Sequence, residues 1–184
     1  MSKASTYATA TPVDGDKLLG TDDPAGTPAT KNFLVEAIAT YVGAKLHAYS
    51  GLSVANNAVA QTGITATPAV LTAFDTVLPE SNVTGDHTAN TLTVDAGVAT
   101  GDYLIAASFS FSGSNNATFA FELFKNNVAT GLKMDRKLGT GGDVGSSGFN
   151  GLLELAAGDV LDVRVSGDGA TVTVSNAQIV VTKQ

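Results

Sequence analysis

The stretch GDYLIAASFSF, residues 101–111, alternates between large apolar side chains and smaller ones. In an extended chain, successive side chains point to opposite faces, so every second residue shares a face. The face with the large side chains holds Tyr103, Ile105, Ala107, Phe109 and Phe111. This period of two predicts a β-strand with one buried face, and it is the starting point for the fold.

Further stretches in the C-terminal half repeat the same period. They are residues 117–127 (ATFAFELFKNN), 159–168 (DVLDVRVSGD) and 170–183 (ATVTVSNAQIVVTK). Turn-forming residues lie between the stretches, with Asn126 and Asn127 as one example. Short alternating strands separated by turn residues predict an antiparallel sandwich or jelly roll.

Four segments, taken in order, resemble the strand signature of the C1q/tumour-necrosis-factor-like jelly roll. They are GDYLIAASFSF (101–111), FELFKNN (121–127), FNGLLEL (149–155) and AGDVLDVRV (157–165). The resemblance covers residues 68–184 and implies a mainly β fold, an antiparallel jelly-roll sandwich. Domains of this family are typically homotrimers about a threefold axis, so it also implies self-assembly of the chain.

The N-terminal part differs in composition from this domain. Residues 1–30 are small and polar and contain three prolines, which predicts an extended arm. Apolar residues then recur at helical spacing, which predicts one short α-helix over residues 32–47. Residues 50–67 are small and predict a linker. We therefore expect an arm and helix (1–49), a linker (50–67) and a jelly-roll head (68–184).

The opening segment carries a second resemblance. DKLLGTD (16–22) and TKNFLVEAIATYV (30–42) are similar to N-terminal segments of fibre and capsid-decorating proteins of tailed bacteriophages, although Leu34 stands where threonine is common. This similarity implies a virion-anchoring arm in front of a trimeric head. The residues that we expect to attach the protein to the virion are Leu18, Leu19, Asp22, Phe33, Val35, Ile38 and Val42.

Composition excludes several function classes. The net charge is −7, and no lysine or arginine lies between Lys45 and Lys125, so a nucleic-acid backbone finds little to bind there. The chain has no cysteine, which rules out disulfides and thiolate chemistry. No signal-peptide core and no long apolar run are present, so we expect synthesis in the host cytoplasm and no membrane insertion.

Few residues could support catalysis. The only histidines are His47 and His87, and neither has a convincing nucleophile beside it in the sequence. The Gly-rich segment 139–148 lacks the Lys-Ser/Thr ending of a phosphate-binding loop and precedes a strand. We expect no enzyme activity, no cofactor and no metal. A metal bound by three copies of His87 on a threefold axis, and an Asp86–His87 catalytic pair, are the minor alternatives.

Two features of the head suggest contacts with other molecules. The apolar pattern of residues 119–124 extends to both faces of the strand, which suggests Phe119, Phe121 and Phe124 as trimer-interface residues. The basic residues cluster in one expected hairpin, which is either solvated or meets an acidic neighbour, another copy or the host particle. They are Lys125, Lys133, Arg136 and Lys137.

The sequence thus predicts a structural phage virion protein, a trimeric capsid decoration protein (cement or head fibre) anchored by its N-terminal arm. Its expected partners are itself and the major capsid protein or another virion protein, and the capsid surface is favoured over the tail. The alternatives are a tail-fibre or receptor-binding tip, and a C1q-like module that binds a glycan or protein such as a host surface receptor.

Overall fold

The computed structural model describes residues 17–22, 29–34 and 47–184. The chain divides into two compact units, residues 1–44 and 45–184, and each is described by itself. Among the described residues, no helix is long and apolar enough to span a membrane.

The described part of the N-terminal unit is a two-stranded antiparallel sheet. β1 (Lys17–Asp22) pairs with β2 (Ala29–Leu34), with Leu18 opposite Phe33. The arm predicted over residues 1–30 is therefore extended at β1 but pairs with its own chain. The predicted start of the helix at residue 32 is wrong, because the backbone of residues 32–34 pairs with β1 in an antiparallel ladder. Residues 35–46 lie outside the described residues.

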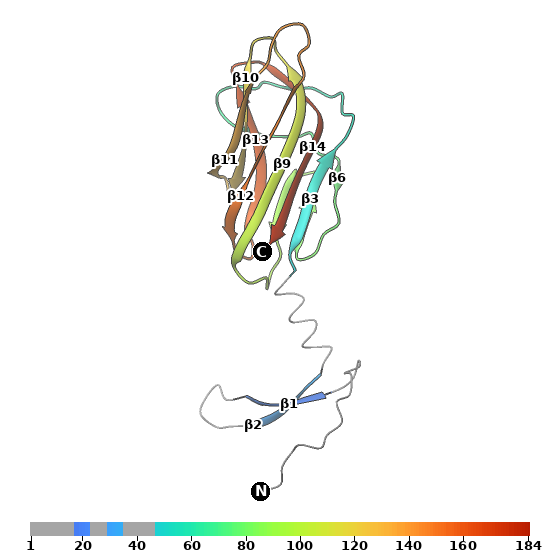
Figure 1. Cartoon of the computed structure of the whole chain (residues 1–184), viewed down its shortest axis with the longest axis vertical. Coiled ribbons are helices and arrows are strands. Elements are labelled where there is room, and N and C mark those ends of the chain that lie inside the picture. The colour runs from blue at the N-terminus through green and yellow to red at the C-terminus, as the bar shows by residue number, and fades with distance from the viewer. Residues whose placement is uncertain (1–16, 23–28, 35–46) are drawn as a thin grey trace. The chain divides into compact units, whose positions relative to one another are not determined.

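The head is a sandwich of two antiparallel sheets (Figure 1). Sheet I has the order β12-β9-β14-β3-β6, with β4 added to β14. Sheet II has the order β11-β10-β13-β8-β7, with β5 added to β13. The strands are β3 (Tyr49–Val54), β4 (Gln61–Thr62), β5 (Ala69–Val70), β6 (Thr76–Val77), β7 (Val83–Asp86), β8 (Thr91–Val94), β9 (Gly101–Gly113), β10 (Thr118–Lys125), β11 (Val128–Lys137), β12 (Gly145–Leu155), β13 (Val160–Gly167) and β14 (Thr171–Lys183).

The core lies between the sheets, as the alternation predicts. The five residues expected on the buried face of β9 are all buried. The ring of Phe121 from sheet II lies 4.8 Å from the rings of both Phe109 and Phe111 of sheet I, measured between centroids. Interlocked aromatic rings of this kind add to the free energy gained from burial alone, so they hold the two sheets together.

The predicted linker over residues 50–67 differs most from the observed fold. Its first residues belong to β3, which pairs with β14 along residues 49–54 inside sheet I. A side chain at Gly51 would place its Cβ 2.5 Å from the carbonyl oxygen of Ile179. Gly51, one of the small residues that suggested a linker, therefore fits only because it has no side chain where the neighbouring strand lies close.

Both edges of the sandwich end in exposed strands. β11 and β12 border one side of the molecule, and β6 and β7 border the other (Figure 1). The turn between β10 and β11 holds Asn126 and Asn127, both with positive φ, a conformation that suits a tight hairpin. The head thus has two edges and two outer faces through which it could contact another molecule.

Candidate self-association surface

The outer face of sheet I carries a row of apolar side chains that crosses the sheet. The strand register places Leu152 opposite Leu104, Leu104 opposite Thr182, and Thr182 opposite Tyr49. Residues directly opposite each other in antiparallel strands share a face. Four strands, β12, β9, β14 and β3, therefore contribute to one continuous row.

This row is exposed in the single chain. The exposed fractions are 64% for Leu152, 41% for Leu104 and 40% for Tyr49. Isolated exposed apolar residues are common on soluble proteins, but three in one row on a flat sheet form a patch. We use the name neutral face for one part of the outer face of sheet I. It includes this row and extends along the strands as far as Ser146 on β12.

Small uncharged residues cover the rest of the neutral face. Ala106, Ser108, Gly148 and Gln178 help to line a shallow hollow of about 370 Å³. From the apolar row to Ser146, the outward positions of β12, β9, β14 and β3 in this described region carry no charged side chain. Asp102 and Glu154 lie opposite each other on the other side of the row, where the neutral face ends. Covering the face from the row to Ser146 would remove no charged side chain from water, and burying a charge is costly.

The outer face of sheet II has the opposite character. Lys133 lies opposite Glu122, and Glu122 lies opposite Arg164, so a row of charges crosses three strands. Lys133 also forms an ion pair with Asp135, with 3.6 Å between the charged atoms. Water solvates such a face well, so it is less suited to a tight apolar contact.

Arg164 covers the outward apolar side chain of this face. Its guanidinium carbon lies 4.3 Å from the ring centroid of Phe124. The same guanidinium donates to both carboxylate oxygens of Asp162, at 2.6 and 3.1 Å, and also to the side chain of Asn127. The hydrogen bond to Asp162 raises the pKa of Arg164, so the arginine is charged under all ordinary conditions.

The structure does not support the predicted trimer-interface residues. Phe119 and Phe121 are fully buried between the sheets of one chain, and Phe124 is 8% exposed beneath Arg164. Phe119, Phe121 and Leu123 point inward, so the regular alternation of β10 turns Phe124 to the outer face, where Arg164 covers it. None of the three side chains offers a second copy an exposed surface.

The predicted attachment residues fall partly within the N-terminal sheet. Leu18, Leu19 and Asp22 belong to β1, and Phe33 belongs to β2. Their backbones pair in one ladder, in which Leu19 lies opposite Asn32. The remaining residues of the set, Val35, Ile38 and Val42, lie outside the described residues.

The polar candidates have structural roles. A carboxylate oxygen of Asp86 accepts hydrogen bonds from the backbone N–H groups of Thr88 and Ala89, at 2.8 and 2.9 Å. These bonds, with a smaller contribution from the charge of His87, hold the pKa of Asp86 below its usual value. Asp86 therefore stabilises a turn. No cluster of three metal-ligating side chains occurs in the described residues.

The Gly-rich segment 139–148 closes on itself before β12 begins. The N–H of Gly139 donates to the Asp143 carboxylate at 2.7 Å, and the carbonyl oxygen of Gly139 accepts from Asn116. Gly141 and Gly142 have positive φ, which glycine tolerates without strain. The segment leads into a strand, so it offers an anion no helix N-terminus.

Comparison with known proteins places the fold. No protein-family model matches the chain, and no curated protein is similar to it in sequence. Among solved structures, murine APRIL is similar over 75% of this chain and 99% of its own, with a TM-score of 0.54 and 15% identity. Eiger TNF from S. frugiperda is similar over 76% and 94%, with a TM-score of 0.52 and 17% identity. The head therefore has a TNF-like jelly-roll fold.

The sequence analysis did not predict the neutral face, because its residues come together only when the strands pair in the observed register. Leu104, Leu152 and Tyr49 lie far apart in the chain, and each alone is an ordinary exposed residue. One signal was available. After Asp102, the outward positions of residues 101–111 (Leu104, Ala106, Ser108 and Ser110) lack charge, which is unusual for the solvent side of a strand.

Proposed function

We propose that the chain is a structural virion protein of a tailed bacteriophage, a trimeric capsid decoration protein attached through its N-terminal unit. The observation that carries the trimer is the neutral face, where three large exposed apolar side chains share a row and no charged side chain follows them as far as Ser146. The resemblance of the head to C1q/TNF-like domains, which are typically homotrimers, supports the same conclusion.

The energetics of this face favour a homotypic contact. Burying a leucine or similar side chain fully contributes about 1.5–3 kcal/mol. Leu104, Leu152 and Tyr49 are already partly covered, so each contributes less, a few kcal/mol together for one interface. A cyclic trimer repeats this contact three times, and the sum can offset the loss of translational and rotational freedom on association.

The attachment role rests on the N-terminal unit. A two-stranded sheet such as β1-β2 is marginally stable by itself in water, so it needs a further surface to stabilise it. The similarity of residues 16–22 and 30–42 to the N-terminal segments of phage fibre and decoration proteins suggests that the surface belongs to the virion. A capsid protein is the partner that we favour.

Two measurements test this proposal. Sedimentation equilibrium of the purified full chain at micromolar concentration should give the mass of a trimer, and a monomer would contradict self-assembly. Electron microscopy of the assembled particle should place the protein on the capsid surface. Density at the tail tip instead would make it a receptor-binding protein, and absence from the particle would contradict the virion role.

A truncated chain separates the two parts of the proposal. Without residues 2–44, the head should remain trimeric because it is a compact unit of its own. It should no longer bind particles that lack the protein. If the truncated head still binds them as well as the full chain does, attachment resides in the jelly roll.

A further inference from the structure

A cavity opens at the edge of the head where the chain crosses from one sheet to the other. The N–H of Leu71 donates to the carbonyl oxygen of Val163 in sheet II at 2.8 Å. Four residues later, the N–H of Asp75 donates to the carbonyl oxygen of Ser53 in sheet I at 3.1 Å. The cavity of about 250 Å³ lies beside this crossing, and residues 57–61 contribute another part of its wall.

Side chains of the core form the floor of this cavity. Leu71 and Phe74 come from the crossing, and Val172 and Val174 come from the inner side of β14. All four are buried. An apolar cavity of about 150 Å³ inside a protein can hold a molecule the size of benzene. The space beside the crossing is therefore large enough for a compact apolar group.

Two amide side chains hold the walls in place. The amide of Gln61 donates to the carbonyl oxygen of Val70 at 2.8 Å and accepts from the N–H of Thr72 at 3.0 Å. The amide of Asn57 donates to the carbonyl oxygen of Val174 at 3.0 Å. Each amide thus joins segments that are separate in the sequence. The cavity is formed before any ligand arrives, which lowers the cost of binding.

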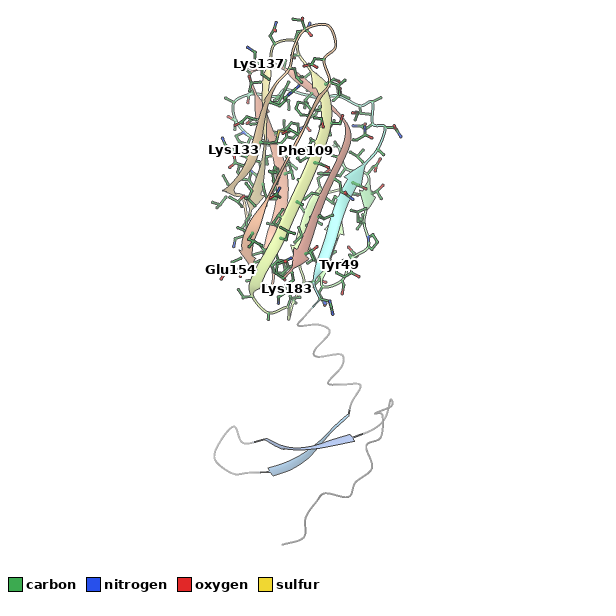
Figure 2. All side chains as sticks on the ribbon, viewed as in Figure 1. Tyr49, Phe109, Lys133, Lys137, Glu154 and Lys183 are labelled. Carbon is green, nitrogen blue, oxygen red and sulfur yellow. The ribbon has the colours of Figure 1, made fainter. Side chains whose placement is uncertain are left out.

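The mouth of the cavity carries a carboxylate. Asp75 accepts from the Thr76 hydroxyl at 2.7 Å, and the described residues give it no ion-pair partner. Residues 46–124 contain no lysine or arginine, and neither do the residues that line the cavity. Figure 2 shows Lys133 and Lys137 along one side of the head, whereas β6, which begins directly after Asp75, lies on the other side (Figure 1). The negative charge at the mouth favours a positively charged ligand.

From these observations, we propose that the cavity binds a small organic ammonium ion with a compact apolar body, of the arylalkylamine class. The apolar body lies against Leu71 and Phe74, and the ammonium group lies at the mouth beside Asp75. Val59 also lines the cavity and is 76% exposed, so a bound ligand removes part of its surface from water. The cavity belongs to one chain, so binding requires neither the trimer nor the virion.

Three small molecules of similar size test the choice of charge. Near neutral pH, phenethylamine is positive, 2-phenylethanol is neutral and phenylacetate is negative. Saturation-transfer NMR with the full chain should give a dissociation constant for phenethylamine on the order of 1 mM, as expected for so small a ligand. Phenethylamine should bind about twofold to fivefold more tightly than 2-phenylethanol at low salt, and phenylacetate should bind most weakly.

Two pairs of variants locate the site. Asp75→Asn keeps an oxygen that can accept from Thr76 but removes the charge, so phenethylamine and 2-phenylethanol should then bind equally. Asp102→Asn changes the net charge by the same amount outside the cavity and should keep the preference. Ala60→Phe fills the mouth and should abolish binding of both molecules. Ala58→Phe, at an exposed position outside the lining, should leave binding unchanged.

Circular dichroism of every variant shows whether the head is folded. If all three molecules bind the unchanged chain equally, the carboxylate does not select the ligand and the ammonium assignment is wrong. If none of them binds, or if Ala60→Phe leaves binding unchanged, the cavity is not a ligand site. Neither result affects the sedimentation or particle-binding measurements that test the proposed function.

Discussion

Outward-pointing apolar residues are covered on sheet II and exposed on sheet I. On sheet II, Phe124 points outward but lies beneath the guanidinium of Arg164, which Asp162 holds in place. On sheet I, Leu104 and Leu152 point outward and are 41% and 64% exposed, with no such cover from the described residues. One face is completed within the chain, and the other is left uncovered.

This difference shows how outward apolar residues on two sheets of one sandwich can have different roles. A charged side chain that lies across a ring hides apolar surface and leaves its polar atoms in water. Between the row and Ser146, the outward positions of the neutral face hold no charged side chain, and Gln178, the longest amide side chain there, leaves Leu104 and Leu152 41% and 64% exposed. The available cover is another molecule.

The largest expected effect concerns the core that both faces share. Phe121→Ala should lower the free energy of unfolding by about 3–5 kcal/mol, because it removes a fully buried ring and leaves a cavity beside Phe109 and Phe111. Urea unfolding followed by circular dichroism measures this. The loss should persist in a form that no longer self-associates. If the variant instead keeps its stability and loses only its assembly, Phe121 belongs to an interface.

Losing the Arg164 side chain that covers Phe124 on sheet II should lower the free energy of unfolding by less than losing the Phe121 ring does. Arg164→Ala exposes Phe124 and leaves the nearly buried carboxylate of Asp162 without its partner, so we expect a loss of about 2–3 kcal/mol. Replacing both Arg164 and Asp162 with alanine should cost less than the sum of the two single changes. Thermal unfolding of the four proteins gives this coupling. Additive losses would mean that the pair does not act as a unit.

The smallest effect on the folded chain is expected on the neutral face. Leu104→Ala should leave the unfolding of a single head almost unchanged but weaken association by about 1–2 kcal/mol at each interface. Sedimentation equilibrium measures the shift toward monomer. Val128→Ala is a suitable control, since Val128 is 67% exposed at the far end of the β10–β11 hairpin. An equal effect of both changes would argue against the neutral face.

The sequence predicted the long strands well because each is specified by its own alternation. The inward residues of β9 are buried as expected, and the similarity to solved TNF-like structures confirms the jelly roll. Local period and turn residues suffice for such elements, since both act between near neighbours in the chain.

The sequence predicted less well where partners decide the structure. Residues 50–54 look like a linker in the sequence, but they form a strand because β14 pairs with them. Residues 29–34 form a strand because residues 17–22 pair with them. Phe124 looked like an interface residue because nothing in its neighbourhood shows that Arg164 covers it. These features depend on tertiary contacts that outweigh local propensity.

The position of β14 has a consequence for how the head is made. β14 lies between β9 and β3, so the two earlier strands have no shared neighbour until residues 171–183 have been synthesised. At ordinary rates of translation, β3 waits on the order of ten seconds for this partner. Pairing over such a sequence distance is also slow in itself. Sheet I therefore closes late, and because the neutral face is its outer surface, the self-association proposed above has to wait until residues 171–183 have been synthesised and paired.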